Sequence, residues 1–362
     1  MKQIQLPQGM QDLFPEDCRE KERLRSVFLD VFRRYGYRQI ETPLIEYYAT
    51  YQNAYEELEE TKMYKLTSSE GKVMTLRGDM TLPIARLCVT KFNTTKPPYR
   101  FAYCGDVYQI NESFAGKRNA VTDCGIELVG MDESGDLEVL CCALDALEVS
   151  GCEGYILEIG TSAVFLMACR EAGIDEDTGK ELAELIDRKS IPDIEKMVKG
   201  LGLSAKQERF FQKLALMSGI DVFTRTEELC FSESLLQEIR KLERLKTMLE
   251  ELGYGEHIRF DLGKAAQLDY YTGIIFQAYV NGAGTAVLSG GRYDDLLNKL
   301  GRPLPAIGFS IKLDYLLDAV KTEKKEIRKL FYKKDDLVSA IRMAKEMQKD
   351  GPVELVPEEG GE

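Results

Sequence analysis

Four carboxylates have the clearest potential for chemistry in this sequence, and they occur in or beside segments with the alternating pattern of strands. They are Asp79, Asp123, Glu127 and Asp269, with Thr81, Tyr270 and Tyr271 close to them along the chain. An ammonium group needs several oxygen acceptors, and an imidazole pairs with a carboxylate and a phenol. These residue types could therefore bind a cationic or amine-bearing small ligand. Spacing alone leaves a second interpretation open, because alternate acids on a strand commonly face solvent.

Several other kinds of site are excluded by composition. The sequence has one histidine, His257, and nine cysteines, none of them in a Cys-x-x-Cys pair. Serine or cysteine triads and histidine-rich metal sites need an imidazole as base or ligand, so both are disfavoured. Most cysteines stand in apolar runs, which predicts buried reduced thiols. We expect no metal and no cofactor, and a structural role for His257 at the entrance to a strand.

Charge and hydropathy narrow the choice of partners. The chain has 362 residues and a formal net charge of −13. This acidity disfavours a sequence-independent hold on nucleic acid, which needs clustered Lys and Arg side chains. The N-terminus lacks the apolar core of a signal peptide, and no stretch approaches the roughly 20 apolar residues of a membrane span. We expect a soluble, cytoplasmic protein with no membrane partner.

The elements that would position these acids follow from hydrophobic periodicity and turn residues. A helix is predicted from Pro15 to Gly36, then an edge strand that ends at Pro43. A hairpin, a helix and two long strands are predicted at 63–77, 81–90, 99–109 and 120–130, with a polar loop at 111–119 before the last strand. A helix at 137–149 and a strand at 154–160 follow.

The second half of the chain has a different pattern. Helix follows helix from about 163 to 252, which predicts a helical insertion in a sheet that resumes at 258–262, 274–280 and 285–289. A glycine turn and helix at 290–297 and a strand running into a helix at 305–317 complete this part. Tight hairpins with mixed strand order favour a mainly antiparallel sheet and the α+β class. We expect a core at 1–320, then a charged linker with a short helix and strand at 321–362.

The motifs, taken in order, indicate a family. They are Leu76–Arg86, Tyr103–Tyr108, Gly125–Gly130 and Ser289–Asp294. From Leu6 to about Val320 the chain resembles the core of class II histidyl-tRNA synthetases. It resembles most the paralogous ATP phosphoribosyltransferase regulatory subunits, which have lost aminoacylation. This resemblance implies the class II synthetase-like fold, a mixed sheet flanked by helices.

The resemblance also implies roles for individual residues. Asp79 and Thr81 match the acid and threonine that hold the amino group of histidine in the synthetases. Glu127 and Tyr271 match residues that reach the imidazole, and Tyr293 would line the same cavity. Asp123 matches a glutamine that also contacts the amino group, so one negative charge is added. These six residues are the candidate histidine-binding site.

Three positions depart from the synthetase pattern. The arginine that clamps the ATP α-phosphate is replaced by Gln109, the arginine that stacks on adenine by Tyr315, and the arginine that bridges carboxylate and phosphate by Ala266. Glutamine, alanine and tyrosine cannot supply the bidentate positive contacts that phosphoryl chemistry needs. We therefore predict that adenylation is lost and that the chain is not itself an enzyme.

The same departures leave the carboxylate of a bound histidine without a partner beside acids, at a cost of several kcal/mol. Two hypotheses follow. Either Arg77, Arg86 or Arg292 moves into the pocket, or the pocket is vestigial and histidine binds elsewhere, such as at a partner interface. Arg118, on the polar loop, is a further candidate contact that would more commonly be a solvated charge.

The resemblance implies a non-catalytic regulatory subunit of ATP phosphoribosyltransferase, which catalyses the first step of histidine biosynthesis. Its partner would be a short-form catalytic subunit, and it would provide activation and histidine feedback. A homodimer within a hetero-oligomer is expected through the segment from Tyr37 to Pro43 and the preceding helix. No tRNA partner is expected, because a full anticodon-binding domain does not follow Val320. Two alternatives stay open: a divergent synthetase-like amino-acid ligase, and a stand-alone amino-acid sensor.

Overall fold

The computed structural model of the chain describes residues 5–55, 58, 60–111, 117–219, 221–264, 271–320 and 327–358. The chain divides after Val320 into two compact units. The first extends from Met1 to Val320 and the second from Lys321 to Glu362.

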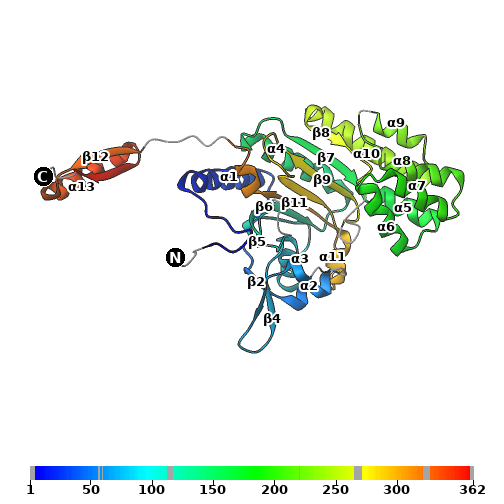
Figure 1. The fold of residues 1–362 in the computed structure, drawn as a ribbon, viewed down its shortest axis with the longest axis horizontal. Coiled ribbons are helices and arrows are strands. Elements are labelled where there is room, and N and C mark those ends of the chain that lie inside the picture. Colours follow the sequence, from blue (N-terminus) through cyan, green and yellow to red (C-terminus); the bar gives the residue numbers. More distant parts are fainter. Residues whose placement is uncertain are drawn as a thin grey trace. The chain divides into compact units, whose positions relative to one another are not determined.

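An eight-stranded sheet forms the centre of the first unit, in the order β1-β5-β6-β11-β10-β9-β7-β8 (Figure 1). Its strands are β1 (Arg38–Gln39), β5 (Tyr99–Tyr108), β6 (Ala120–Val129), β11 (Ala306–Lys312), β10 (Leu288–Arg292), β9 (Ile274–Tyr279), β7 (Ile156–Thr161) and β8 (Ile258–Phe260). The pairs are antiparallel except β1–β5 and β7–β8 at the two edges. The α+β class with a mixed, mainly antiparallel sheet is thereby confirmed.

The first unit also contains a smaller antiparallel sheet of three strands. Its strands are β2 (Ile45–Tyr47), β4 (Val73–Leu76) and β3 (Lys65–Thr67), in the order β2-β4-β3. Strands β3 and β4 form the predicted hairpin.

Helices cover both faces of the central sheet. They are α1 (Pro15–Arg34), α2 (Tyr48–Ala54), α3 (Thr81–Lys91), α4 (Asp136–Ser150), α11 (Asp294–Lys299) and α12 (Leu313–Leu317). Helix α1 begins with a proline and two acids in its first turn, which complement the helix dipole. Its buried residues pack with those of α4 and with the inward side chains of β6 and β11 in one hydrophobic core. A second core joins α2, α3 and α11.

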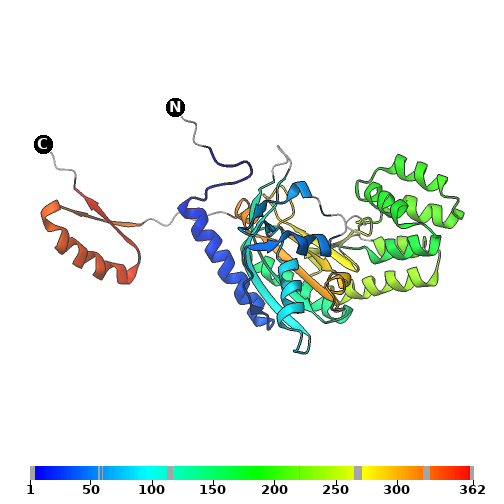
Figure 2. The ribbon, with the colours of Figure 1, turned by 90° about the horizontal axis from the view of Figure 1, so that it is seen from below.

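The predicted helical insertion consists of α5 (Ala163–Ala172), α6 (Glu176–Asp187), α7 (Ile191–Gly200), α8 (Ala205–Leu214), α9 (Val222–Glu227) and α10 (Glu233–Glu251). Helices α5 to α9 gather beside one end of the central sheet in both views (Figures 1 and 2). Asp175, Ser204 and Ser232 cap the starts of α6, α8 and α10, each accepting a hydrogen bond from a backbone N–H of the first turn.

Two predicted details are wrong. The edge strand after α1 is only two residues long, and Gly290 and Gly291 lie inside β10 and not in a turn. A Cβ atom at Gly290 would lie 2.4 Å from the carbonyl oxygen of Gly308, and one at Gly291 would lie 2.6 Å from the Tyr271 ring. Close packing against the strand therefore requires these glycines.

The second unit is a β-α-β element made of β12 (Arg328–Tyr332), α13 (Leu337–Met347) and β13 (Val353–Pro357), with its two strands parallel. Strand β12 lies in the charged stretch that the sequence analysis assigned to a linker. Its inward positions, Leu330 and Tyr332, alternate with exposed Lys329 and Phe331. Because this alternation is short and lies among charged residues, the sequence pattern does not predict the strand.

All nine cysteines are free thiols and six are buried, as their apolar surroundings predict. The described part of the chain has no cluster of His, Cys, Asp and Glu side chains suited to a metal ion. None of its helices is long and apolar enough to cross a membrane.

Candidate functional site

A cavity of about 620 Å³ opens over the central sheet, and all six candidate binding residues line it. They are Asp79, Thr81, Asp123, Glu127, Tyr271 and Tyr293. Five neighbouring strands, β5, β6, β11, β10 and β9, contribute residues to its lining, together with the segment that leads into α3. Asp269 and Tyr270 lie outside the described residues.

Successive side chains of β6 point alternately into the hydrophobic core and into the cavity. Cys124, Ile126 and Leu128 belong to the core that includes α1 and α4. Because successive strand residues point to opposite faces, Asp123 and Glu127 project from the other face, into the cavity. These acids are therefore buried rather than solvated.

Glycines on the neighbouring strands leave room for the polar side chains. A Cβ atom at Gly308, directly opposite Glu127 on β11, would lie 1.8 Å from Glu127 Oε2. The same atom at Gly291 would collide with the ring of Tyr271. Both positions must stay without a side chain if Glu127 and Tyr271 are to occupy the cavity.

Glu127 is the most buried carboxylate of the site. Thr81 Oγ1 donates a hydrogen bond to its Oε1 at 2.8 Å, and the Tyr293 hydroxyl donates to its Oε2. Burial raises the pKa of Glu127 to about 8, against the lowering effect of these two donors. In the absence of a cationic ligand this carboxyl is therefore largely protonated near neutral pH.

Asp79 stands at the start of α3. Its Oδ1 accepts a hydrogen bond from the Leu82 backbone N–H at 2.7 Å, and its Oδ2 accepts one from the Tyr55 hydroxyl at 3.3 Å. Burial raises the pKa of Asp79 to about 6, and the negative charge of Asp123 adds to the increase. Its two donors keep the side chain fixed while it faces the cavity.

Asp123 is buried and incompletely paired. Its Oδ1 has no hydrogen-bond partner among the described residues, and Lys312 Nζ lies 3.9 Å from it. Burial raises the pKa of Asp123, and the positive charge of Lys312 opposes the increase. Burial also raises the pKa of Tyr271, and the nearby carboxylates of Glu127 and Asp79 add to this effect. The cavity is thus rich in acceptors and suited to a cationic ligand.

Two of the positions that lack the synthetase arginine are occupied by side chains bound to the backbone. Gln109 Nε2 donates to the Gly78 carbonyl oxygen at 2.8 Å, and the Tyr315 hydroxyl accepts from the Arg118 backbone N–H at 3.2 Å. Ala266 lies outside the described residues.

None of the three arginines proposed to enter the pocket lines it in the described structure. Arg77 donates to the carbonyl oxygens of Asp106 and Thr42, at 2.7 and 2.8 Å. Arg86 is paired with buried Glu46, at 2.6 Å between Nη2 and Oε1. Moving Arg86 away would leave the buried Glu46 carboxylate unpaired, and moving Arg77 would break its hydrogen bonds to these two carbonyl oxygens.

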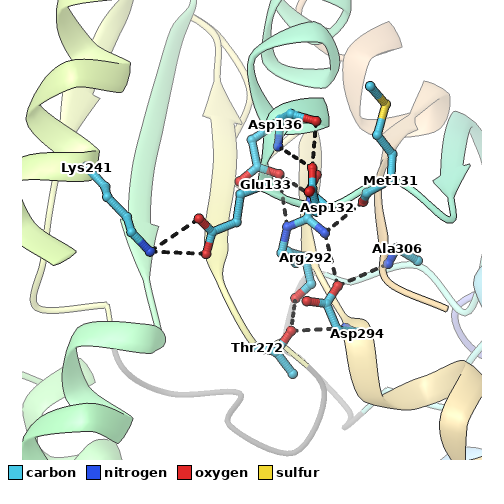
Figure 3. Close-up of polar contacts among 10 residues, drawn as sticks. Met131, Asp132, Glu133, Asp136, Lys241, Thr272, Arg292, Asp294 and Ala306 are labelled. Carbon is cyan, nitrogen blue, oxygen red and sulfur yellow. Dashed lines mark hydrogen bonds and ion pairs between the residues drawn. The ribbon is translucent and has the colours of Figure 1, made fainter. Parts of the chain in front are cut away.

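Arg292 is the most firmly held of the three (Figure 3). Its Nε donates to Asp136 Oδ1 at 3.0 Å, its Nη1 pairs with Asp294 at 3.0 Å, and its Nη2 donates to the Asp132 carbonyl oxygen at 2.7 Å. Breaking one side of a buried ion pair costs about 3–5 kcal/mol. The hypothesis that one of these arginines moves into the pocket is therefore disfavoured.

Arg118, the loop arginine, does line the cavity, but its guanidinium is occupied. Its Nη2 donates to both carboxylate oxygens of Asp318, at 2.8 and 3.0 Å, and its Nη1 donates to the Asp314 carbonyl oxygen. This arginine therefore joins the loop to α12.

Comparison with known proteins decides the family. The family model of histidyl-tRNA synthetase matches residues 9–316. The ATP phosphoribosyltransferase regulatory subunit of Acetivibrio thermocellus is 30% identical, with 99% of this chain and 88% of that protein covered. The regulatory subunit of a Thermoanaerobacter species is 33% identical, with 90% of this chain and 85% of that protein covered. The chain belongs to the ATP phosphoribosyltransferase regulatory subunit family.

Solved structures agree with this assignment. A Bacillus halodurans protein described as an ATP phosphoribosyltransferase regulatory subunit/histidyl-tRNA synthetase is 28% identical and superposes with a TM-score of 0.89, covering 100% of this chain and 94% of its own. Histidyl-tRNA synthetase from Nostoc, at 20% identity and a TM-score of 0.81 over 100% of this chain and 88% of its own, shares the fold. The regulatory-subunit family thus has the predicted class II synthetase-like core.

The sequence analysis missed several polar residues of this regulatory-subunit pocket, among them Lys62, Lys117, Ser310 and Lys312. Lys312 is the cation within ion-pair range of Asp123. It lies at the end of β11, whose other cavity-lining residues include Gly308 and Ser310. The signal was present in the sequence, because small or polar residues alternate with Ile307, Phe309 and Ile311 along this strand.

Proposed function

We propose that this chain is a non-catalytic regulatory subunit required for the activity of a short-form ATP phosphoribosyltransferase catalytic subunit, and that it transmits feedback inhibition by histidine. The partner would form phosphoribosyl-ATP and pyrophosphate from ATP and phosphoribosyl pyrophosphate. The names of the relatives support the regulatory role. The chemistry of the cavity supports the ligand.

The observation that carries this proposal is the contrast between the acids that line the cavity and the positions that lack the synthetase arginines. The acids and phenols suited to an ammonium and an imidazole are present around Glu127. At the phosphate end, Gln109 is bound to Gly78, and the guanidinium of Arg118 is bound to Asp318 and Asp314. Each missing transition-state donor typically costs about 10²- to 10³-fold in rate. A pocket that recognises an amino acid without activating it suits a sensor subunit.

Feedback requires that histidine bind the inhibited assembly more tightly than the active one. A difference of about 1–3 kcal/mol is typical of such coupling. The uncharged state of Glu127 provides a physical route, because a bound cation would favour its ionisation and change the hydrogen bonds of Thr81 and Tyr293. Both side chains adjoin helices, α3 and α11.

The test is reconstitution. Phosphoribosyl-ATP formation by a short-form catalytic subunit from the same source is measured with and without this chain, together with co-elution of the two proteins. We expect a stable complex and a rate that rises strongly when the chain is added. No complex and no activation would contradict the proposal. ATP–pyrophosphate exchange with an amino acid, catalysed by this chain alone, would instead support the divergent ligase.

A further inference from the structure

The amino-acid end of the cavity is formed by a pair of directly opposed strand residues. Asp123 on β6 faces Lys312 on β11, and Gly125 faces Ser310. Opposed residues of antiparallel strands project from the same face. Asp123, Ser310 and Lys312 accordingly all line the cavity, with no side chain at Gly125 between them.

Two buried oxygen atoms at this end make no hydrogen bond in the described structure, although the Ser310 hydroxyl lies close enough to Asp123 to lower the pKa of that carboxyl. Asp123 is 6% exposed, and neither its Oδ1 nor Ser310 Oγ has a hydrogen-bond partner within the described ranges of the chain. Buried polar atoms are almost always hydrogen-bonded in native proteins. An unpaired carboxylate oxygen facing a cavity therefore indicates a missing donor, and an ammonium group would provide one.

Lys312 is close to Asp123 but does not satisfy it. The distance of 3.9 Å between Lys312 Nζ and Asp123 Oδ1 is within ion-pair range and too long for a hydrogen bond. The Lys312 side chain is 31% exposed, so its ammonium is partly solvated and able to turn. Among the described residues this is the one cationic side chain within ion-pair range of Asp79, Asp123 or Glu127.

We propose that Lys312 pairs with the carboxylate of a bound α-amino acid whose ammonium lies at Asp123 and Ser310. Lysine and acid would together hold both charges of the zwitterion, and Lys312 would replace the missing arginine as the residue that selects an amino acid over an amine. This inference rests on the proposed histidine binding and identifies the group that makes it possible.

The length of the site fits this arrangement. Glu127 lies four residues along β6 from Asp123, which separates their Cα atoms by roughly 13 Å. Both side chains line the same cavity. A small amino acid can therefore direct its side chain to Glu127 and Tyr271 while its charged groups reach Asp123 and Lys312.

The sequence outside the described residues adds no competing cation nearby in the chain. The segments 112–116 and 265–270, which adjoin cavity-lining residues in the sequence, contain no Lys or Arg. Lys62, Lys117 and Arg118 also line the cavity, but among the described residues Lys312 is the cation within ion-pair range of Asp123. If Lys312 did not serve the carboxylate, the acids at this end would favour an amine. The two arrangements therefore predict opposite ligand preferences.

Calorimetric titration of the full chain with L-histidine and with histamine distinguishes them, because the two probes share imidazole and amine and differ in the carboxylate. We expect the wild type to prefer L-histidine. Lys312→Met should weaken L-histidine binding by about tenfold or more, the usual effect of losing a charge-assisted hydrogen bond, and should not weaken histamine binding. Lys312→Arg should restore the preference.

Lys241→Met is the matched control, because it removes a partly exposed lysine that pairs with Glu238 and Glu133 outside the cavity. It should leave both affinities unchanged. A wild type that prefers histamine, or a Lys312→Met variant that keeps the wild-type preference, would overturn this inference alone. Failure of the wild type to bind either probe would overturn it together with histidine binding in this pocket, whereas activation of the catalytic subunit would be unaffected.

Discussion

Three acids share one cavity, and burial keeps at least one of them uncharged. Glu127 has a pKa of about 8 and Asp79 one of about 6, both raised chiefly by burial. Like charges in a low-dielectric site repel strongly, so some of these carboxyl groups are protonated when no cationic ligand is bound. A cationic ligand would release their protons. The chemistry of the site thus lies in its acceptors, and among the described side chains Lys312 is the cation within ion-pair range of them.

Glu127→Gln should change how stability depends on pH. The pKa of Glu127 is raised from 4.5 to about 8 on folding, so its favourable contribution is complete below about pH 4.5 and is lost as pH rises toward 8. Glutamine does not titrate, so the unfolding free energy of the variant does not fall in this way as pH rises. Relative to it, the wild type should lose up to a few kcal/mol of unfolding free energy between pH 5 and pH 8.

The measurement is urea unfolding of the unliganded wild type and variant across this range. Glu22→Gln, at a glutamate whose side chain is 73% exposed, is the control and should follow the wild type. Parallel curves for Glu127→Gln and the wild type would show that Glu127 does not titrate in this window.

At the scale of elements, the sequence predicted much of what carries the site. Alternation along the strands at 120–130 and 305–312, with the helix after Met80, correctly located the β6, β11 and α3 segments from which the cavity is built. The predicted α+β fold is confirmed as well. These features depend on local periodicity, which a sequence displays directly.

The features that could not be predicted from the sequence depend on contacts between residues far apart in the chain. Gly290 and Gly291 resemble a turn, because close approach to Gly308 and Tyr271 becomes visible only when the strands are paired. The Arg292 side chain is held by Asp136, a helix residue 156 positions earlier in the chain. The proximity of Lys312 to Asp123 follows from strand register. None of these contacts is encoded in local spacing.

Gly308→Ala tests the closeness of β11 to the site. Its new methyl group would collide with Glu127 and with the Ile126 carbonyl oxygen, 2.4 Å away. We expect a loss of about 1–3 kcal/mol in unfolding free energy and weaker L-histidine binding. Gly284→Ala, where no atom lies within 4 Å, is the control and should be neutral. A Gly308→Ala variant with wild-type stability and affinity would refute the packing described for β11.

Arg292→Met tests the buried clamp between β10 and the start of α4. The change leaves Asp136 buried without its guanidinium partner, so we expect a loss of about 3–5 kcal/mol in unfolding free energy. The double variant Arg292→Met/Asp136→Leu should recover part of this loss. Calorimetric melting of the three proteins measures both effects. An Arg292→Met protein as stable as the wild type would mean that the clamp is dispensable.

At the scale of the whole molecule, the small sheet exposes apolar side chains that a monomer would leave in water. Leu44, Ile45, Tyr47, Leu66 and Val73 are each at least 40% exposed. Tyr47 and Leu66 both lie opposite Met74, so they share one face of the sheet with Ile45. Exposed apolar surface of this kind commonly marks a protein interface. Strand β2 follows closely after the segment from Tyr37 to Pro43, where the resemblance to class II synthetases predicts the homodimer contact.

We therefore expect the full chain to sediment as a homodimer at micromolar concentration. Ile45→Glu/Tyr47→Glu would place two charges on this surface and should give a folded monomer, because burying unpaired carboxylates is costly. Met248→Glu, at an exposed apolar residue on α10, is the control and should stay dimeric. A monomeric wild type, or a double variant that remains a dimer, would contradict this assignment of the interface.

The central claim is that the cavity senses histidine on behalf of a catalytic partner. Its most direct test is phosphoribosyl-ATP formation by the reconstituted complex across a histidine titration, with either the wild-type chain or Glu127→Gln, each normalised to its own rate without histidine. We predict that histidine inhibits the wild-type complex and that the variant needs about tenfold more histidine or greater, because the acceptor for the imidazole loses its charge. Equal inhibition of both complexes, or none of the wild type, would contradict the account.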